Sequence, residues 1–305
     1  MVRALVLFSG GLDSRLAVKL LQEQNIEIVA VMFKLPFSGG CCNNELCSFR
    51  FSQVEGAKLE IIDCTKSKLF QEYLNIIKKP KHGTGTSINP CIDCRIFIIK
   101  QAKKLMKKFK CDFMATGEVL GERPMSQHKS ALDIVEQEAG VEILRPLSAK
   151  LLKETSYEKN KLVNREKLLD IQGRSRKNQI QLAEKYNIKY PSPGGGCVLC
   201  EKEYAKKLKD LLMHTKDITP EHIILLKGFR HFRDKAKIIL GKDHNENLVL
   251  EKINKKLKWN IIIPDNPGPT AIFENKQDKS TTEKLIAAYS SKDIKKRKKF
   301  EKLKI

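Results

Sequence analysis

The stretch ALVLFSGGLDS, residues 4–14, decides the fold of this chain. An apolar run typical of a β-strand leads into two glycines, and a helical pattern of apolar residues follows. Glycines let a backbone approach a phosphate, and the first turn of a helix has unpaired N–H groups that bind anions. The stretch therefore predicts a phosphate site after the first strand, made of Ser9, Gly10, Gly11 and Ser14.

Three more β-type runs follow at residues 26–33, 59–62 and 113–116, with helical stretches between them. This alternation predicts an α/β fold with a doubly wound parallel sheet. Ligands of such sheets bind beyond the carboxyl ends of the strands. We therefore expect the ligand of the phosphate site to contact the ends of the second and fourth strands as well, at Met32, Phe33 and Gly117.

The composition indicates a folded protein with an anionic partner. The chain has 305 residues, of which 41% are hydrophobic, and its 58 Lys and Arg exceed its 36 Asp and Glu by 22. Such an excess favours a nucleic acid as partner, although a general preference for lysine would give the same count. No apolar stretch approaches the roughly 20 residues of a membrane span, and the N-terminus lacks the layout of a signal peptide. We expect a cytoplasmic protein that does not enter membranes.

Nine cysteines without a secretory signal indicate metal or redox chemistry rather than a disulfide framework. Cys91 and Cys94 form a C-x-x-C pair just before a predicted helix, and Cys197 and Cys200 form a second pair. Four thiolates would complete a structural zinc site, and this alternative stays open. Three further cysteines match no metal signature; they lie in the loop after the second strand, at Cys41, Cys42 and Cys47.

The segment SGGLDS at residues 9–14 resembles the PP-loop of ATP pyrophosphatases, which cleave ATP between its α and β phosphates. In order along the chain, NPCIDCR at 89–95, TGE at 116–118 and the late Cys197 extend the resemblance to PP-loop tRNA thiolation enzymes, the 2-thiouridine and 4-thiouridine synthetases. The resemblance covers residues up to about 200. It implies a HUP-like fold, ATP and Mg²⁺ as cofactors, and tRNA as substrate.

The same resemblance implies roles for individual residues. Asp13 would help to place Mg²⁺, and Cys91, Cys94 and Cys197 would act in catalysis as the ligands of a [4Fe–4S] cluster. A persulfide mechanism at two cysteines is the alternative. Sulfide or a cysteine desulfurase would supply the sulfur. Competing functions are a PP-loop amide ligase or other adenylating enzyme for a small molecule, and a zinc-stabilised RNA-binding protein. The oligomeric state and the modified uridine are not predicted.

The second half of the chain predicts a smaller, basic α+β domain. We expect domain boundaries that give residues 1–215, 216–275 and 276–305, the last a basic tail with 11 Lys and Arg against 4 Asp and Glu. Residues 228–247 and 267–269 partly resemble the NFACT-R module of RNA-associated proteins. The residues predicted to contact RNA lie in both parts of the chain: Arg123, Arg174, Arg176, Lys177, Arg230 and Arg233.

Overall fold

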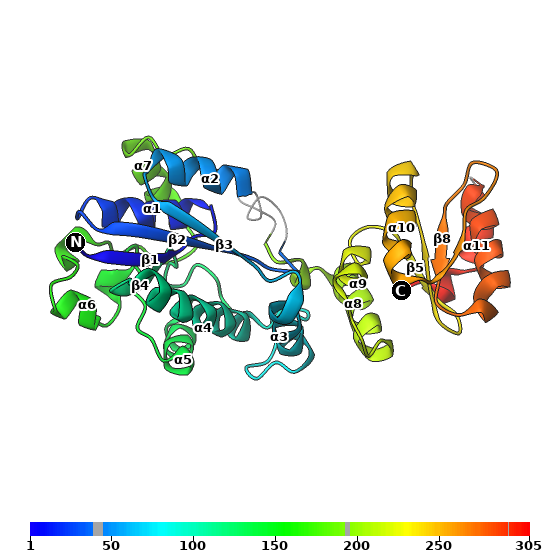
Figure 1. Cartoon of the computed structure of the whole chain (residues 1–305), viewed down its shortest axis with the longest axis horizontal. Coiled ribbons are helices and arrows are strands. Elements are labelled where there is room, and N and C mark those ends of the chain that lie inside the picture. The colour runs from blue at the N-terminus through cyan, green and yellow to red at the C-terminus, as the bar shows by residue number, and fades with distance from the viewer. Residues whose placement is uncertain (39–44, 193–195, 292) are drawn as a thin grey trace. The chain divides into compact units, whose positions relative to one another are not determined.

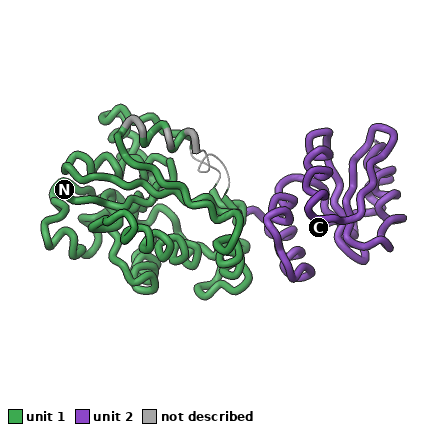
Figure 2. The backbone as a smooth tube through the Cα atoms, in the orientation of Figure 1, with its two compact units in different colours: residues 1–200 green, residues 201–305 purple. Residues whose placement is uncertain are grey.

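The computed structural model describes residues 1–38, 45–192, 196–291 and 293–305, which form two compact units, 1–200 and 201–305 (Figure 2). The break between the units lies 15 residues before the predicted boundary at 215. Helix α8, Lys202–His214, begins just after this break and belongs to the second unit. Its Asp210 carboxylate accepts hydrogen bonds from Arg233 and from the buried Lys237, and these contacts tie the helix to the second unit.

The first unit is built around a parallel sheet of four strands in the order β3-β2-β1-β4 (Figure 1). The strands are β1 Arg3–Leu7, β2 Glu27–Lys34, β3 Lys58–Asp63 and β4 Phe113–Thr116. All three strand pairs are parallel, and β1 and β4 are buried almost completely. Both faces of such strands need cover, which explains why their sequences read as continuous apolar runs. The predicted α/β fold with a parallel sheet is confirmed.

Helices cover both faces of this sheet. Figure 1 shows α1, α2 and α7 on one face, and α4 and α5 on the other. The core beneath α1 includes Leu12, Leu16 and Leu20, which recur at helical spacing along that helix. The helices of the unit are α1 Leu12–Gln22, α2 Glu45–Val54, α3 Ser67–Lys78, α4 Cys91–Phe109, α5 Lys129–Ala139, α6 Ser156–Lys159 and α7 Lys177–Lys185, with short 3₁₀ turns at Ala149–Leu151, Arg165–Lys167 and Val198–Cys200.

The second unit contains an antiparallel sheet with the strand order β5-β6-β8-β7. Its four strands are short, with three or four residues each. Its strands are β5 Arg230–Arg233, β6 Lys237–Leu240, β7 Asn260–Ile262 and β8 Ala271–Phe273. Its helices are α8 Lys202–His214, α9 Pro220–Leu225, α10 His244–Leu257, α11 Lys279–Ser290 and α12 Ile294–Lys298, with 3₁₀ turns at Lys276–Asp278 and Glu301–Leu303.

Residues from 276 onward are part of this fold rather than a separate tail. Leu285 on α11 is fully buried, and the partly buried Phe300 and Leu303 pack against the same apolar cluster. The backbone N–H of Ile305 donates to the carbonyl oxygen of His231 on β5. Because lysine dominates the sequence of this segment, its few apolar residues did not indicate that it packs against a core. Among the described residues, no helix is both long enough and apolar enough to cross a membrane.

Candidate active site

The turn between β1 and α1 depends on its two glycines. Gly10 has a φ of 78°, and a Cβ atom at this position would lie 2.6 Å from Ser48 Oγ. Gly11 is the N-cap of α1 and makes no side-chain cap. The Ser14 hydroxyl donates to the Gly11 carbonyl oxygen at 2.9 Å, and Ser9 Oγ lies 3.3 Å from Ser14 Oγ. The first turn of α1 therefore presents backbone N–H groups without a side-chain acceptor, as anion sites do.

The end of β4 lies directly against this turn. A Cβ atom at Gly117 would lie 2.5 Å from the carbonyl carbon of Asp13 and from the backbone nitrogen of Ser14. Real Cβ atoms do not approach a backbone so closely, so only glycine fits here without a shift of the main chain. The absence of a side chain at Gly117 thus lets the end of β4 pack against the turn that follows β1, at one edge of the sheet.

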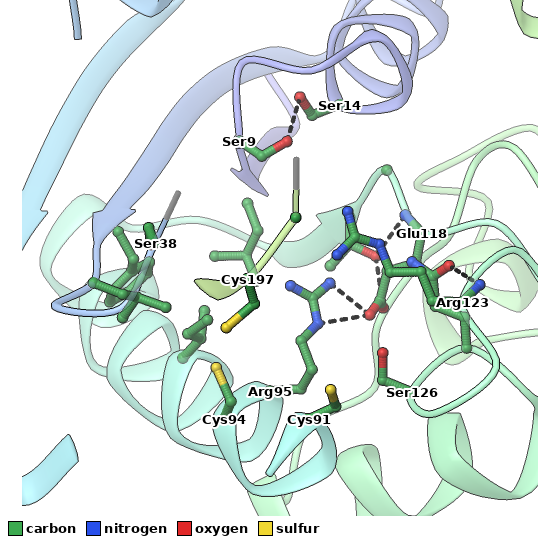
Figure 3. A pocket seen from close by; sticks show the side chains of 18 of the residues that line it. Ser9, Ser14, Ser38, Cys91, Cys94, Arg95, Glu118, Arg123, Ser126 and Cys197 are labelled. Atoms are coloured by element: carbon green, nitrogen blue, oxygen red, sulfur yellow. Dashed lines mark hydrogen bonds and ion pairs between the residues drawn. The ribbon is translucent and has the colours of Figure 1, made fainter. Parts of the chain in front are cut away.

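A cavity of about 280 Å³ opens at this edge (Figure 3). Most of the predicted site residues line it, although they come from five separate segments. Gly10 and Gly11 shape the turn but do not line the cavity themselves. The predicted residues that line it are Ser9, Asp13, Ser14, Met32, Phe33, Cys91, Cys94, Gly117, Arg123 and Cys197.

The first cysteine pair lies at the start of α4, where Cys91 is the first helical residue. Asn89 Nδ2 donates to Cys91 Sγ at 3.2 Å, and the hydroxyl of the buried Tyr73 lies 3.1 Å from Cys94 Sγ. Burial raises the pKa of the Cys94 thiol, although the Tyr73 hydroxyl and the Arg95 guanidinium oppose this effect. Both thiols are free and face the cavity (Figure 3).

Cys197 reaches the cavity from the far end of the first unit. It pairs with Ser38 in an antiparallel bridge, and its Sγ lies 3.7 Å from the carbonyl oxygen of Phe37. Burial raises the pKa of this thiol to about 12. Cys200 is exposed and is not part of the cavity lining. Among the described residues, no three His, Cys, Asp or Glu side chains stand in the arrangement of a metal site. Cys41 and Cys42 lie outside the described residues.

A buried network of charges forms one wall of the cavity. Arg95 donates to Glu118 Oε1 through Nε at 2.8 Å and Nη2 at 2.5 Å. The other oxygen of Glu118 accepts from Arg145 Nε and from the Thr116 hydroxyl, each at 3.1 Å. Arg145 in turn pairs with Glu136. Two arginines hold the pKa of Glu118 at about 2, despite a burial that acts in the opposite direction. Sequence reasoning assigned no role to this network.

Asp13 lies among further charged and polar groups. Its Oδ1 atom is buried and has no hydrogen-bond partner among the described residues. Burial raises the pKa of Asp13, while the charge of Arg176 is the strongest influence that lowers it. Gln179 is fully buried close to this carboxyl, and both of its amide atoms also lack a described partner. The pKa of Glu122 is raised by burial and by the nearby Asp13. The carboxyl groups would suit a bound cation, and the guanidinium and the amide would suit an anionic ligand bound together with it.

The arginines predicted to contact RNA lie in different environments. Arg174 and Lys177 are exposed at the start of α7. Arg230 donates to a backbone carbonyl oxygen and lies over the ring of Tyr289. Arg233 forms two hydrogen bonds with Asp210, at 2.6 and 3.0 Å. The two arginines of the second unit that were predicted to contact RNA are therefore engaged in internal contacts.

Residues 2–182 match the family model described as "Thiamine biosynthesis protein (ThiI)". This chain belongs to the ThiI family. A probable tRNA sulfurtransferase of Alkaliphilus metalliredigens is 29% identical to it over 148 residues, which are 48% of this chain and 36% of that protein. The chain thus matches only about a third of that relative's length. Membership confirms the resemblance to the PP-loop thiolation group that the motifs indicated.

Two solved structures are similar to parts of this ThiI-family chain. A 4-thiouridine synthetase in complex with RNA and ATP has 18% identity and a TM-score of 0.45, and the match covers 74% of this chain and 52% of that one. The U34-tRNA thiolase NcsA from Methanococcus maripaludis, solved with its [4Fe-4S] cluster, has 19% identity and a TM-score of 0.36, with 74% and 70% covered.

Proposed function

We infer that this chain is an ATP-dependent tRNA-uridine sulfurtransferase. The observation that supports this most strongly is that the PP-loop and three cysteine thiols line the same cavity. ATP would bind at the first turn of α1. A carbonyl oxygen of uridine would form a bond to the α-phosphorus, while the bond from that phosphorus to the pyrophosphate oxygen breaks. The uridine would then carry an adenylate.

A sulfur nucleophile would next attack the activated carbon. The carbon–sulfur bond forms, the carbon–oxygen bond breaks, and the electron pair leaves with AMP. Adenylation is needed because the carbonyl oxygen of uracil is a poor leaving group. The cavity suits this sequence of steps, since it contains both phosphate-binding groups and groups that carry sulfur.

Mg²⁺ would be held by Asp13. Its buried Oδ1 atom lacks a partner among the described residues, and carboxylate oxygens are the ligands that Mg²⁺ prefers. The ion would neutralise charge on the phosphates as pyrophosphate leaves. Arg176 close by would bind the same phosphates or the RNA backbone.

The [4Fe–4S] cluster would be held by Cys91, Cys94 and Cys197. Their donor chemistry fits, because all three thiols line one cavity while Cys200 lies exposed outside it. When bound, the cluster supplies an iron without a protein ligand, which can carry hydrosulfide. The buried Tyr73 and Asn89 would orient the first two thiols. Sulfide or a cysteine desulfurase would provide the sulfur.

tRNA would be drawn to the chain by its excess of 22 positive charges. Arg123 lines the cavity, and it would contact the RNA backbone together with the exposed Arg174 and Lys177. The second unit, with its partial resemblance to NFACT-R, would add affinity without selecting a base.

The substrate class is tested by nucleoside analysis of bulk tRNA from a deletion strain, complemented with the intact protein or with Asp13→Ala. We expect one thionucleoside to be missing and to return only with the intact protein. Asp13→Ala should also abolish RNA-dependent release of pyrophosphate. An unchanged set of thionucleosides would favour an adenylating enzyme for a small molecule.

The metal site is tested with single cysteine variants purified without oxygen. Cys91→Ala, Cys94→Ala and Cys197→Ala should each remove the iron and its visible absorbance, whereas Cys200→Ala serves as the matched control and should retain both. Equal loss of metal in all four variants would indicate a site with four thiolate ligands, as in a structural zinc site. Iron absent from the intact protein would favour the persulfide mechanism.

A further inference from the structure

Arg95 is the only arginine on α4, and its side chain lines the cavity that also contains the PP-loop and the three thiols. In the view of Figure 3 its guanidinium is placed between the thiols of Cys94 and Cys197 and the hydroxyls of Ser9 and Ser14. Cys94 directly precedes Arg95 on α4, and the thiols of Cys91 and Cys94 line the same cavity, which places Arg95 near the sulfur side. Arg95 therefore stands where the phosphate half of the cavity meets the sulfur half.

The guanidinium is held rigidly on one side only. Nε and Nη2 both donate to Glu118, whose side chain is only 4% exposed, while the side chain of Arg95 remains 27% exposed. Among the described residues, nothing accepts a hydrogen bond from Nη1. Glu118 is fixed in turn by Arg145 and Thr116. A positively charged donor in a fixed orientation thus faces the cavity.

The three cysteine thiols do not accept a hydrogen bond from Nη1 of Arg95. Cys91 contacts the side-chain amide of Asn89, Cys94 contacts the hydroxyl of Tyr73, and Cys197 contacts a backbone carbonyl oxygen. Each sulfur thus has a neutral partner of its own. A planar guanidinium with a free edge is well suited to a phosphate oxygen, because it donates in a fixed geometry and stays charged.

We propose that Arg95 binds the phosphate of the adenylyl group and stabilises the negative charge that develops on AMP as it leaves. This inference rests on the proposed function, because it needs an adenylate in the cavity. As the carbon–sulfur bond forms and the carbon–oxygen bond breaks, the electron pair moves to the phosphate oxygen that faces Nη1. No proton is transferred, since arginine stays protonated. Glu118 is the positioning residue that orients the guanidinium.

The test measures AMP and adenosine binding to the full chain by calorimetry, with Arg95→Gln and Arg95→Lys. Arg165→Gln is the matched control. Arg165 also pairs with a buried glutamate, Glu158, and has 25% of its side chain exposed, but it does not line the cavity. We expect Arg95→Gln to weaken AMP binding by about tenfold or more, because a charge-assisted hydrogen bond is removed, and to leave adenosine binding unchanged. The AMP affinity of Arg95→Lys should lie between those of the intact protein and Arg95→Gln, because lysine keeps the positive charge but lacks the planar guanidinium donors. It also provides a folded variant if Arg95→Gln unfolds.

Unchanged AMP affinity in Arg95→Lys and Arg95→Gln would overturn the inference, as would an equal loss of AMP and adenosine binding. Loss of iron with normal AMP binding would place Arg95 on the sulfur side instead and would also overturn it. If the intact protein binds neither ATP nor AMP, the proposed function fails together with the inference. If the intact protein binds ATP and AMP, and the Arg95 variants bind AMP as tightly as Arg165→Gln does, the proposed function stands and only the inference fails.

Discussion

Glu118→Gln should destabilise the first unit far more than the loss of one charge on the surface would. The change removes the negative charge that Arg95 and Arg145 share and replaces one of the two acceptor oxygens with an NH₂ donor, and Arg145 is only 4% exposed. The pKa of Glu118 falls from 4.5 to about 2 in the folded chain, which corresponds to about 3 kcal/mol in favour of the ionised carboxylate. Removal of one partner from a buried pair costs about 3–5 kcal/mol. We therefore expect a loss of about 3 kcal/mol at pH 7.

Thermal unfolding followed by circular dichroism measures this loss. A unit of this size loses about 2–4 °C for each kcal/mol, so the midpoint should fall by about 6–12 °C. Glu27→Gln is the control, because its pair with Arg3 is largely exposed and should contribute at most about 1 kcal/mol. Because the folded pKa is depressed, the stabilisation is complete above about pH 4.5 and is lost as the pH falls toward 2. The two variants should thus converge at low pH. Equal midpoints for Glu118→Gln and Glu27→Gln at pH 7 would refute the reasoning.

Three further predictions concern the turn and the second unit. Gly117→Ala should cost about 1–3 kcal/mol and weaken ATP binding, because its Cβ would press on the backbone of Asp13; Gly83→Ala, whose Cβ meets nothing within 4 Å, should leave ATP binding intact. Deletion of residues 276–305 should abolish cooperative unfolding of the second unit, because Leu285 is removed from its core, whereas a retained transition would show that the segment is dispensable. Substitution of Lys295, Lys296 and Lys298 by Gln should preserve the fold and make the salt dependence of tRNA binding shallower, by roughly 0.9 in the logarithmic slope for each duplex phosphate that these lysines no longer neutralise; parallel slopes would exclude them from the interface.

The first unit was predictable because its local and global signals agree. Strands β1, β2 and β4 are apolar over most of their length, and the glycines of the PP-loop lie shortly after the first strand. Topology then brings the ends of parallel strands to one edge. This rule alone places Met32, Phe33 and Gly117 in the cavity without any knowledge of side-chain positions.

The charge network was not predictable by the same means. Glu118 and Arg145 are separated by 27 residues, and Arg95 precedes Glu118 by 23. Arg95 and Glu118 lie in two of the motifs that indicated the family, but nothing in these motifs shows that the two side chains pair with each other or with Arg145. Only the packing of α4 against β4 brings their charges together. Gln179 was missed for a similar reason, since its burial beside Asp13 depends on how α7 lies against α1.

The second unit shows why charge composition predicts a partner more readily than it predicts the contacts. Lys237 is 4% exposed and donates to Asp210, and burial lowers its pKa to about 8. Lys207 donates to two backbone carbonyl oxygens, and Arg233 also pairs with Asp210. These cations stabilise the fold and are not available to a phosphate. The lysines of α12, by contrast, are exposed to solvent, and this helix has no buried residue. A polyanion would therefore contact α12, the helix that contributes least to the core of this unit. For this reason we expect substitution of its lysines to change tRNA binding without changing stability.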